Sequence, residues 1–216
     1  MTLAYQTAFI DLCVRLGVLR FGHFTLKSGR ESPYFFNAGL FNTGASIGAV
    51  GRAYAAAITG SGLEFDMLFG PAYKGIPLVT VTAAALAEYE GRNLPFAFNR
   101  KEAKNHGEGG RIVGSPLIGR VLIVDDVITA GTAIRESIEI ILAAGARPAG
   151  VLLALDRQER APESRLSAVQ EVRDRYAIPV VCVLDLDDLM QHILTQGRQD
   201  DLARMQSYRE RYGLAD

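Results

Sequence analysis

The sequence predicts an α/β fold in which a mainly parallel central sheet is flanked by helices. Short apolar strands alternate with helical segments from residue 66 onward, which is the pattern of repeated strand–helix units. The strands, above all RVLIVDD at 120–126, are continuous apolar runs. Such runs are expected of strands that helices cover on both faces.

The first forty residues follow a different pattern. An amphipathic helix is predicted over 2–15, because apolar residues recur there at helical spacing. Between 18 and 37, Gly, Ser and Pro alternate with Phe, Tyr and Leu, which indicates short strands and turns. We expect residues 1–40 to form a small N-terminal hood beside the sheet.

The remaining elements follow in regular order. Helices are predicted over 46–58, 76–88, 132–144 and 163–176 and within 188–212, and strands over 66–70, 95–99, 120–126, 150–156 and 179–185. We expect a single domain over 1–216, a length that fits one large domain. In sheets of this kind ligands bind beyond the carboxyl ends of the strands, so functional residues are sought there.

Composition excludes several classes of protein. The formal net charge is -1 and 22% of residues are charged, whereas a general nucleic-acid binder is usually basic. No uncharged apolar run reaches about 18 residues, so no membrane span is expected. The N-terminus lacks the basic start of a signal peptide, and the two cysteines, Cys13 and Cys182, have no metal-ligand spacing. We therefore expect a cytoplasmic protein with buried, reduced thiols.

The strongest motif joins the strand at 120–126 to the helix that begins at Thr132. Asp125 and Asp126 end the strand, and a loop of small residues follows at 127–131. Backbone N–H groups of such a loop, together with a helix N-terminus, bind phosphate. Adjacent carboxylates bind hydroxyls or hydrated Mg²⁺. The combination predicts a phosphorylated sugar; the alternative is a pair of solvated aspartates before a capped helix.

Two further segments carry cations near strand ends. GPAYKG at 70–75 is a turn that presents Tyr73 and Lys74 on the same rim as Asp125, or else an ordinary turn with an exposed lysine. The segment 99–114 is long, polar and rich in glycine, which is typical of a mobile lid over a polyanionic ligand. A solvated loop is the alternative. Its cations are Arg100, Lys101, Lys104, His106 and Arg111.

The run VLIVDDVITAGTA at 121–133 resembles the motif with which type I phosphoribosyltransferases bind phosphoribosyl diphosphate (PRPP). TLKSGRESPYFFNAG (25–39), GPAYKG (70–75), RKEAKNHGEGG (100–110) and LDRQER (155–160) extend the resemblance, over nearly the whole chain, to orotate phosphoribosyltransferases of the short bacterial type. The resemblance implies a type I phosphoribosyltransferase fold, orotate and PRPP as substrates, Mg²⁺ as cofactor, and a role in pyrimidine (UMP) biosynthesis. It also implies a homodimer in which the lid, about 100–114, reaches the neighbouring subunit's site.

The resemblance assigns roles residue by residue. It places PRPP on Lys27, Tyr73, Lys74, Arg100, Lys101, Lys104, His106, Asp125, Asp126, Val127, Ile128, Thr129, Ala130, Gly131, Thr132 and Ala133. It places orotate on Phe35, Phe36, Thr129 and Arg157, and catalysis on Lys101, Lys104, Asp125 and Asp126. Mg²⁺ is expected to be held mainly through PRPP, without an assigned protein ligand. The family's loop also predicts a cis peptide between Ala72 and Tyr73.

Taken singly, these residues also have plainer interpretations. Each Phe is more often a core residue, and Arg157 is more often part of a surface ion pair. Two other functions remain open: a phosphoribosyltransferase for a purine base, which would keep 125–133 but have no use for Arg157, and a PRPP-sensing regulator that binds nucleic acid. The regulator would need a basic helical face outside the active rim, and the sequence provides none.

Overall fold

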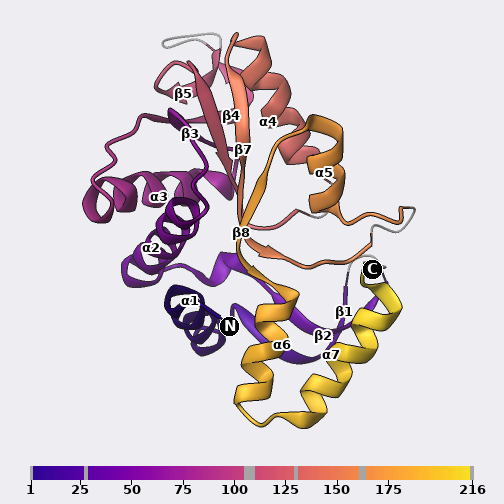
Figure 1. The fold of residues 1–216 in the computed structure, drawn as a ribbon. Coiled ribbons are helices and arrows are strands. Elements are labelled where there is room, and N and C mark those ends of the chain that lie inside the picture. Colours follow the sequence, from indigo (N-terminus) through magenta and orange to yellow (C-terminus); the bar gives the residue numbers. More distant parts are fainter. Residues whose placement is uncertain (1, 27–28, 105–109, 129–130, 161–163, 215–216) are drawn as a thin grey trace.

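Six strands form the central sheet of the computed structural model, which describes residues 2–26, 29–104, 110–128, 131–160 and 164–214 (Figure 1). Their order is β5-β4-β3-β6-β7-β8, and all neighbours are parallel except β5, which is antiparallel to β4. The predicted α/β fold with a mainly parallel sheet is confirmed. The strands are β3 (Met67–Gly70), β4 (Phe96–Lys104), β5 (Gly110–Gly114), β6 (Arg120–Val124), β7 (Arg147–Asp156) and β8 (Val180–Asp185).

Helices cover both faces of this sheet. In β6, Val121 and Ile123 belong to one buried cluster, whereas Leu122 and Val124 belong to another, because successive side chains of a strand point to opposite faces. α2 (Gly44–Gly60) and α3 (Gly75–Tyr89) lie on the Leu122 side, and α4 (Thr132–Ala143) and α5 (Ala168–Tyr176) lie on the other (Figure 1). This double cover explains the continuous apolar runs of the sequence.

The hood contains both ends of the chain. It consists of α1 (Ala4–Arg15), the antiparallel pair β1 (Leu19–Thr25) and β2 (Glu31–Phe36), and two C-terminal helices, α6 (Leu186–Thr195) and α7 (Gln199–Tyr212); a 3-10 turn at Ala38–Leu40 leads from it to α2. α6 begins directly after β8, which brings the hood to the carboxyl edge of the sheet (Figure 1). The hood predicted from residues 1–40 alone therefore lacked its C-terminal half.

Two predicted boundaries are wrong. The segment 99–114 is not one loop, because β4 continues to Lys104 and β5 begins at Gly110, with Asn99 opposite Ile112 in the antiparallel ladder. The ladder supplies hydrogen bonds that the polar sequence of this segment does not reveal. Of the predicted helix at 163–176, residues 164–167 are not helical, because α5 begins after Ser167, whose side chain accepts a hydrogen bond from the backbone N–H of Gln170; residue 163 lies outside the described residues.

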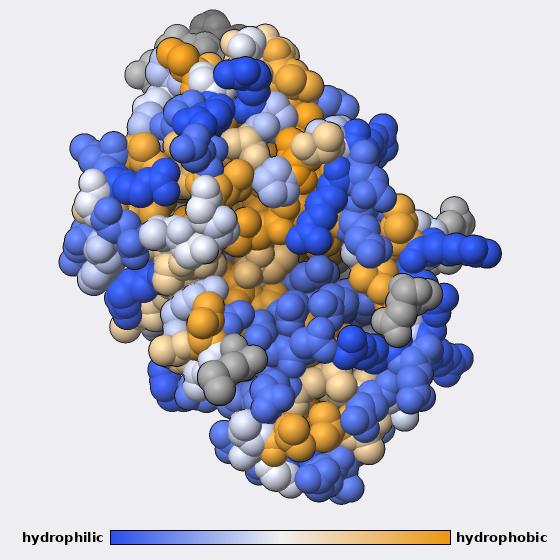
Figure 2. Space-filling view, viewed as in Figure 1, coloured by the Kyte–Doolittle hydropathy of each residue, from blue (hydrophilic) through white to orange (hydrophobic). Residues whose placement is uncertain are grey.

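The surface over the sheet is more hydrophobic than the surface of the hood. On the face shown in Figure 2, hydrophobic side chains gather over the sheet in the upper half, whereas the hood below is covered mostly by hydrophilic ones. In the described part of the chain, no helix is long and apolar enough to cross a bilayer.

Candidate active site

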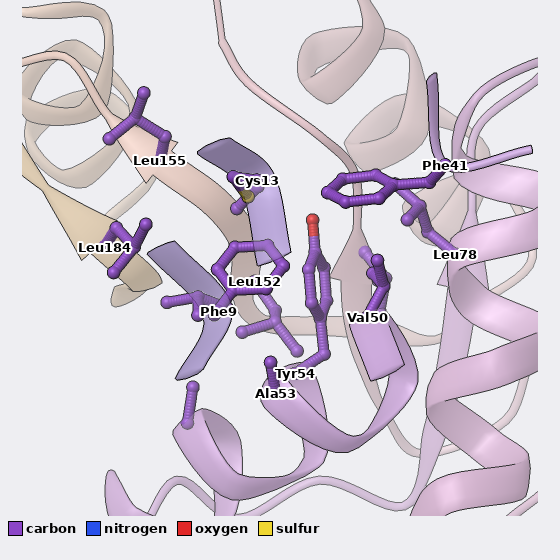
Figure 3. Close-up of a cluster of buried hydrophobic side chains, with 14 of the residues drawn as sticks. Phe9, Cys13, Phe41, Val50, Ala53, Tyr54, Leu78, Leu152, Leu155 and Leu184 are labelled. Atoms are coloured by element: carbon purple, nitrogen blue, oxygen red, sulfur yellow. The ribbon is translucent and has the colours of Figure 1, made fainter. Parts of the chain in front are cut away.

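Asp125 and Asp126 lie just beyond β6 and are almost fully buried, with 8% and 5% of their surfaces exposed. Their backbone remains bonded to β7: the Asp125 N–H donates to Leu152 O (3.0 Å), and the Ala154 N–H donates to Asp126 O (2.8 Å). The Tyr54 hydroxyl of α2 donates to the Asp125 carbonyl at 3.0 Å; Figure 3 shows this side chain within the core cluster. The two carboxyls are therefore held by a rigid backbone.

The two carboxyls share one described cation. Burial and the charge of Asp126 raise the pKa of Asp125 to about 7, although the Asp126 N–H, which donates to Asp125 Oδ1 at 2.9 Å, acts in the opposite direction. Lys74 Nζ lies 2.5 Å from Asp126 Oδ2. Above the pKa of Asp125, the pair carries two negative charges beside one described cation, an arrangement that suits ligand hydroxyls or a metal held by the ligand.

The loop after Asp126 leads into α4. Gly131 has φ +67°, in the left-handed region that favours glycine, and Thr132 is the first residue of the helix. The first-turn N–H groups of α4 have no intrahelical partner and can bind an anion. Thr129 and Ala130, both predicted PRPP contacts, lie outside the described residues.

The turn 70–75 packs tightly against the end of β6. A Cβ at Gly70 would lie 2.3 Å from Gly75 O, and one at Gly75 would lie 2.9 Å from Val124 O. The peptide between Ala72 and Tyr73 is cis, as the sequence analysis predicted. Glycine at 70 lets the turn fold closely over Gly75, and glycine at 75 lets it approach the end of β6. Lys74 thereby lies beside Asp126.

β4 meets the same turn. Asn99 Oδ1 accepts a hydrogen bond from the Ala72 N–H at 2.8 Å. Lys101 Nζ lies 5.1 Å from the centre of the Tyr73 ring, and 67% of the Tyr73 surface is exposed. Cations of the predicted lid therefore begin beside the predicted diphosphate turn. The side chains of Lys27, Lys104 and His106, also predicted PRPP contacts, lie outside the described residues.

Arg157 follows β7 and contacts the hood through Tyr34 of β2. Its Nε donates to Glu159 Oε1 at 2.9 Å, and its Cζ lies 4.8 Å above the ring of Tyr34 in β2. Phe36 packs against the core cluster that includes Tyr34, whereas Phe35 stacks on Phe24 at 5.7 Å. No hydrogen bond, ion pair or cation–π contact among the described residues joins Arg157 to either Phe, so these orotate roles remain predictions.

Four side chains at this site carried no role in the sequence analysis: Tyr34, Tyr54, Asn99 and Glu159. Asn99 ends a predicted strand and Glu159 lies within LDRQER, so both were close to recognised motifs. Tyr34 and Tyr54 stand in apolar surroundings in the sequence, and a buried hydroxyl gives no local signal. All four act through contacts between distant segments.

Two further observations concern possible metal ligands and pockets. No group of three or more His, Cys, Asp or Glu side chains that could hold a metal occurs among the described residues. A pocket of about 390 Å³ lies between β2 and α7. It includes none of the residues at the ends of β3 and β6, so it is separate from the candidate site.

Comparison with known proteins identifies the family. Residues 40–185 match the phosphoribosyl transferase domain family. The chain is 62% identical over 211 residues to the orotate phosphoribosyltransferase of Thioalkalivibrio sulfidiphilus, covering 97% of this chain and 99% of the relative. It is 60% identical to that of Methylococcus capsulatus, covering 98% and 99%. The crystal structure of the Francisella tularensis enzyme aligns with a TM-score of 0.88 at 42% identity, covering 95% of this chain and 99% of that one. The chain belongs to the orotate phosphoribosyltransferase family.

Proposed function

We propose that the chain transfers the phosphoribosyl group of PRPP to orotate, giving orotidine 5′-phosphate and diphosphate in pyrimidine (UMP) biosynthesis. The observation that carries this proposal is the buried Asp125–Asp126 pair between two anion-binding elements. The turn at 70–75 lies on one side of it and the N-terminus of α4 follows on the other. A sugar that bears phosphates at both ends matches this alternation of anion sites and carboxylates.

PRPP binding is divided among these elements. The carboxylates of Asp125 and Asp126 accept the ribose hydroxyls, and the N–H groups from 127 to Ala133 surround a phosphate. Tyr73 and Lys74 contact the diphosphate, together with Arg100, Lys101, Lys104, His106 and Lys27. Mg²⁺, when bound, neutralises charge on the diphosphate oxygens and so makes diphosphate a better leaving group.

The chemistry requires no covalent nucleophile. The bond from the anomeric carbon to diphosphate breaks, its electron pair leaves with the diphosphate, and the ribose becomes oxocarbenium-like. The orotate ring nitrogen attacks from the opposite face and releases its proton to solvent. Negative charge then develops on the leaving diphosphate, where Lys101 and Lys104 stabilise it most in the transition state. Orotate is held by Arg157, Thr129 and the region of Phe35 and Phe36, with the guanidinium paired to its carboxylate.

One assay panel tests the activity and its base. The protein is supplied with PRPP and Mg²⁺ and with orotate, adenine or hypoxanthine in turn, and diphosphate release is followed. Release is expected with orotate only, and omission of Mg²⁺ should abolish it. Release with a purine base but not with orotate would show that Arg157 does not select the base.

The subunit arrangement and compartment are further parts of the proposal. We propose a cytoplasmic single-domain protein that forms a homodimer, in which the 100–114 segment of one subunit completes the site of the other. Mixing Lys101→Ala with Arg157→Ala subunits, at an orotate concentration below the KM of Arg157→Ala, should then give more activity than the two variants give separately, because some hybrid dimers hold one intact site. Subunit exchange without any return of activity would place the segment over its own subunit's site.

A further inference from the structure

Glu159 is a nearly buried carboxylate at the contact between the sheet and the hood. Its side chain is 11% exposed, and its Oε1 accepts hydrogen bonds from the Tyr34 hydroxyl at 3.0 Å and from Arg157 Nε at 2.9 Å. Arg30 Nη1 lies 3.9 Å from its other oxygen. A carboxylate this far from water stays ionised only when charged and polar partners replace its hydration.

These contacts fix the plane and direction of the Arg157 guanidinium. One edge faces Glu159, and one face covers the ring of Tyr34. The Nη2 atom is 2.7 Å from the same glutamate oxygen, but it is buried and has no aligned hydrogen bond to a described residue. A guanidinium is a rigid fork of five donors, so fixing its Nε edge determines where its other N–H groups point.

The anchor does not depend on Arg157 itself. Tyr34 is fully buried, and this burial raises its pKa well above the usual value of 10, so its hydroxyl remains a donor to Glu159. The Glu159 backbone forms an antiparallel bridge with Gly213, just after α7. Two separate elements of the hood therefore hold the carboxylate in place before any ligand arrives.

The charges of the cluster are also matched to a carboxylate ligand. Arg30 and Arg157 are each 18% exposed at the side chain and flank the single carboxylate of Glu159. One net positive charge remains, which is the charge needed to pair with one carboxylate. Without Glu159, two arginines would stand close together and Arg157 would lose its described hydrogen-bond acceptor, so its orientation would have to be fixed on binding.

We infer that Glu159 is a positioning residue: it orients Arg157, and thereby sets the affinity and selectivity of the site for a base that carries a carboxylate. The inference rests on the proposed role of Arg157 in holding orotate. It extends that role by assigning the geometry of the arginine to a carboxylate and a tyrosine that have no proposed contact with the substrate.

Steady-state kinetics of Glu159→Ala and Glu159→Gln provide the first test. Glu159→Ala is expected to raise KM for orotate about tenfold or more, the range for losing a hydrogen bond to a charged group, with KM for PRPP unchanged. Glu159→Gln should have a smaller effect, because its amide oxygen still accepts both hydrogen bonds. Glu64→Ala, which removes an exposed partner of Arg120, is the matched control and should change neither KM.

A double-mutant cycle separates positioning from general loss of structure. In an Arg157→Ala background, Glu159→Ala should cause no further rise in KM for orotate, because the residue that it positions is absent. A further rise equal to that seen in the single variant would overturn the inference. A raised KM in Arg157→Ala with a normal KM in Glu159→Ala would overturn it too, while leaving the role of Arg157 intact.

The remaining outcomes are equally distinct. An unchanged KM for orotate in Arg157→Ala would refute the proposed role of Arg157, and the inference with it. Thermal melting shows whether each variant is folded. If Glu159→Ala does not fold, Tyr34→Phe carries the test, because it keeps the ring under Arg157 and removes one donor to Glu159. It should raise KM for orotate in the same direction by a smaller factor, and equal increases in both substrates' KM values would contradict positioning.

Discussion

Ion pairs lie at both ends of the strands of the six-stranded sheet, here called the amino edge and the carboxyl edge, and the aspartates at the two ends differ in burial and in pKa. At the amino end of β6, Arg120 is paired with Asp66 at 2.9 Å and with Glu64 at 2.6 Å, and all three side chains are exposed. At the carboxyl end, Lys74 is paired with Asp126 at 2.5 Å, but the carboxylate is buried. The same strand therefore begins at an ion pair with exposed carboxylates and ends at one whose carboxylate is buried.

The pKa values of the aspartates express this difference. Hydrogen bonds from the Arg120 side chain and backbone lower the pKa of Asp66 to about 2. Burial and a neighbouring carboxylate raise the pKa of Asp125 to about 7. At the amino edge, Arg120 pairs with both acidic side chains. At the carboxyl edge, Lys74 pairs, among the described residues, with Asp126 only, so a ligand can supply further hydrogen-bond donors to the two aspartates. Position in the sheet, rather than residue type, separates the aspartate that is paired within the protein from those that we propose bind substrate.

Removing a carboxylate from each edge is the strongest test of this contrast. Asp126→Ala is expected to lower kcat/KM for PRPP about a thousandfold, an effect of about 4 kcal/mol that is typical for the loss of a preorganised electrostatic contact. Asp66→Ala, its matched control, should leave kcat/KM within about twofold. Steady-state kinetics measure both, and comparable losses in the two variants would remove the distinction between the edges.

Lys101 tests whether the carboxyl edge acts mainly in the transition state. Lys101→Ala should lower kcat about a hundredfold, roughly 3 kcal/mol, and change KM for PRPP much less, because charge on the diphosphate grows as the bond breaks. Arg111→Ala removes a cation of the same segment, in strand β5, that is assigned no contact with PRPP, and it should have little effect. A normal kcat with only a raised KM would assign Lys101 to ground-state binding.

The raised pKa of Asp125 predicts a pH dependence at one edge only. If PRPP requires the ionised carboxylate, a pKa of about 7 implies a KM about tenfold higher at pH 6 than at pH 8. Asp125→Asn should lack this component, and the variant also corrects for titration of PRPP itself. Parallel pH profiles in the two proteins would exclude Asp125 as the titrating group.

The raised pKa of Asp125 also predicts how stability changes with pH. The folded protein keeps the Asp125 proton to a higher pH than the unfolded chain does, so it binds more protons between about pH 4 and pH 7. The contribution of Asp125 to stability then falls as pH rises through that range. Melting temperatures of Asp125→Asn measured in parallel should decline less than those of the unaltered protein.

The smallest effect is expected at the amino edge. Arg120→Ala removes two exposed ion pairs, so the melting temperature should fall slightly and the difference should shrink as salt is added. Kinetic constants should not change. A loss of activity at unchanged stability would mean that the charges of this edge reach the site through the strand.

Local sequence predicted the carboxyl edge better than the hood. The apolar run before Asp125 and the small residues before Thr132 define a strand, a loop and a helix within a few residues. The hood depends on contacts between the two ends of the chain, such as the edge-on packing of Tyr34 and Tyr208 at 6.3 Å, which leave no local pattern.

The β4–β5 ladder and the Glu159 cluster were missed for a related reason. Residues 100–104 are mostly polar, and the pairing of this segment with β5 at Asn99 and Lys104 has no local signal in the sequence. Glu159 reads as one charge within LDRQER, and its importance depends on Tyr34, far away in the chain. Interactions at long sequence separation were therefore the part that could not be predicted from composition or periodicity.

The division of the hood between both ends of the chain has a consequence for biosynthesis. β1 and β2 leave the ribosome early, whereas α7 and the Tyr212 carbonyl that accepts from the Arg160 N–H follow the whole sheet. Until α7 emerges, Tyr34 lacks its packing partner Tyr208 and is more exposed than in the finished protein, which buries it completely. Such surface is what chaperones bind, so a ribosome-bound chain with a complete sheet still lacks the support that orients Arg157.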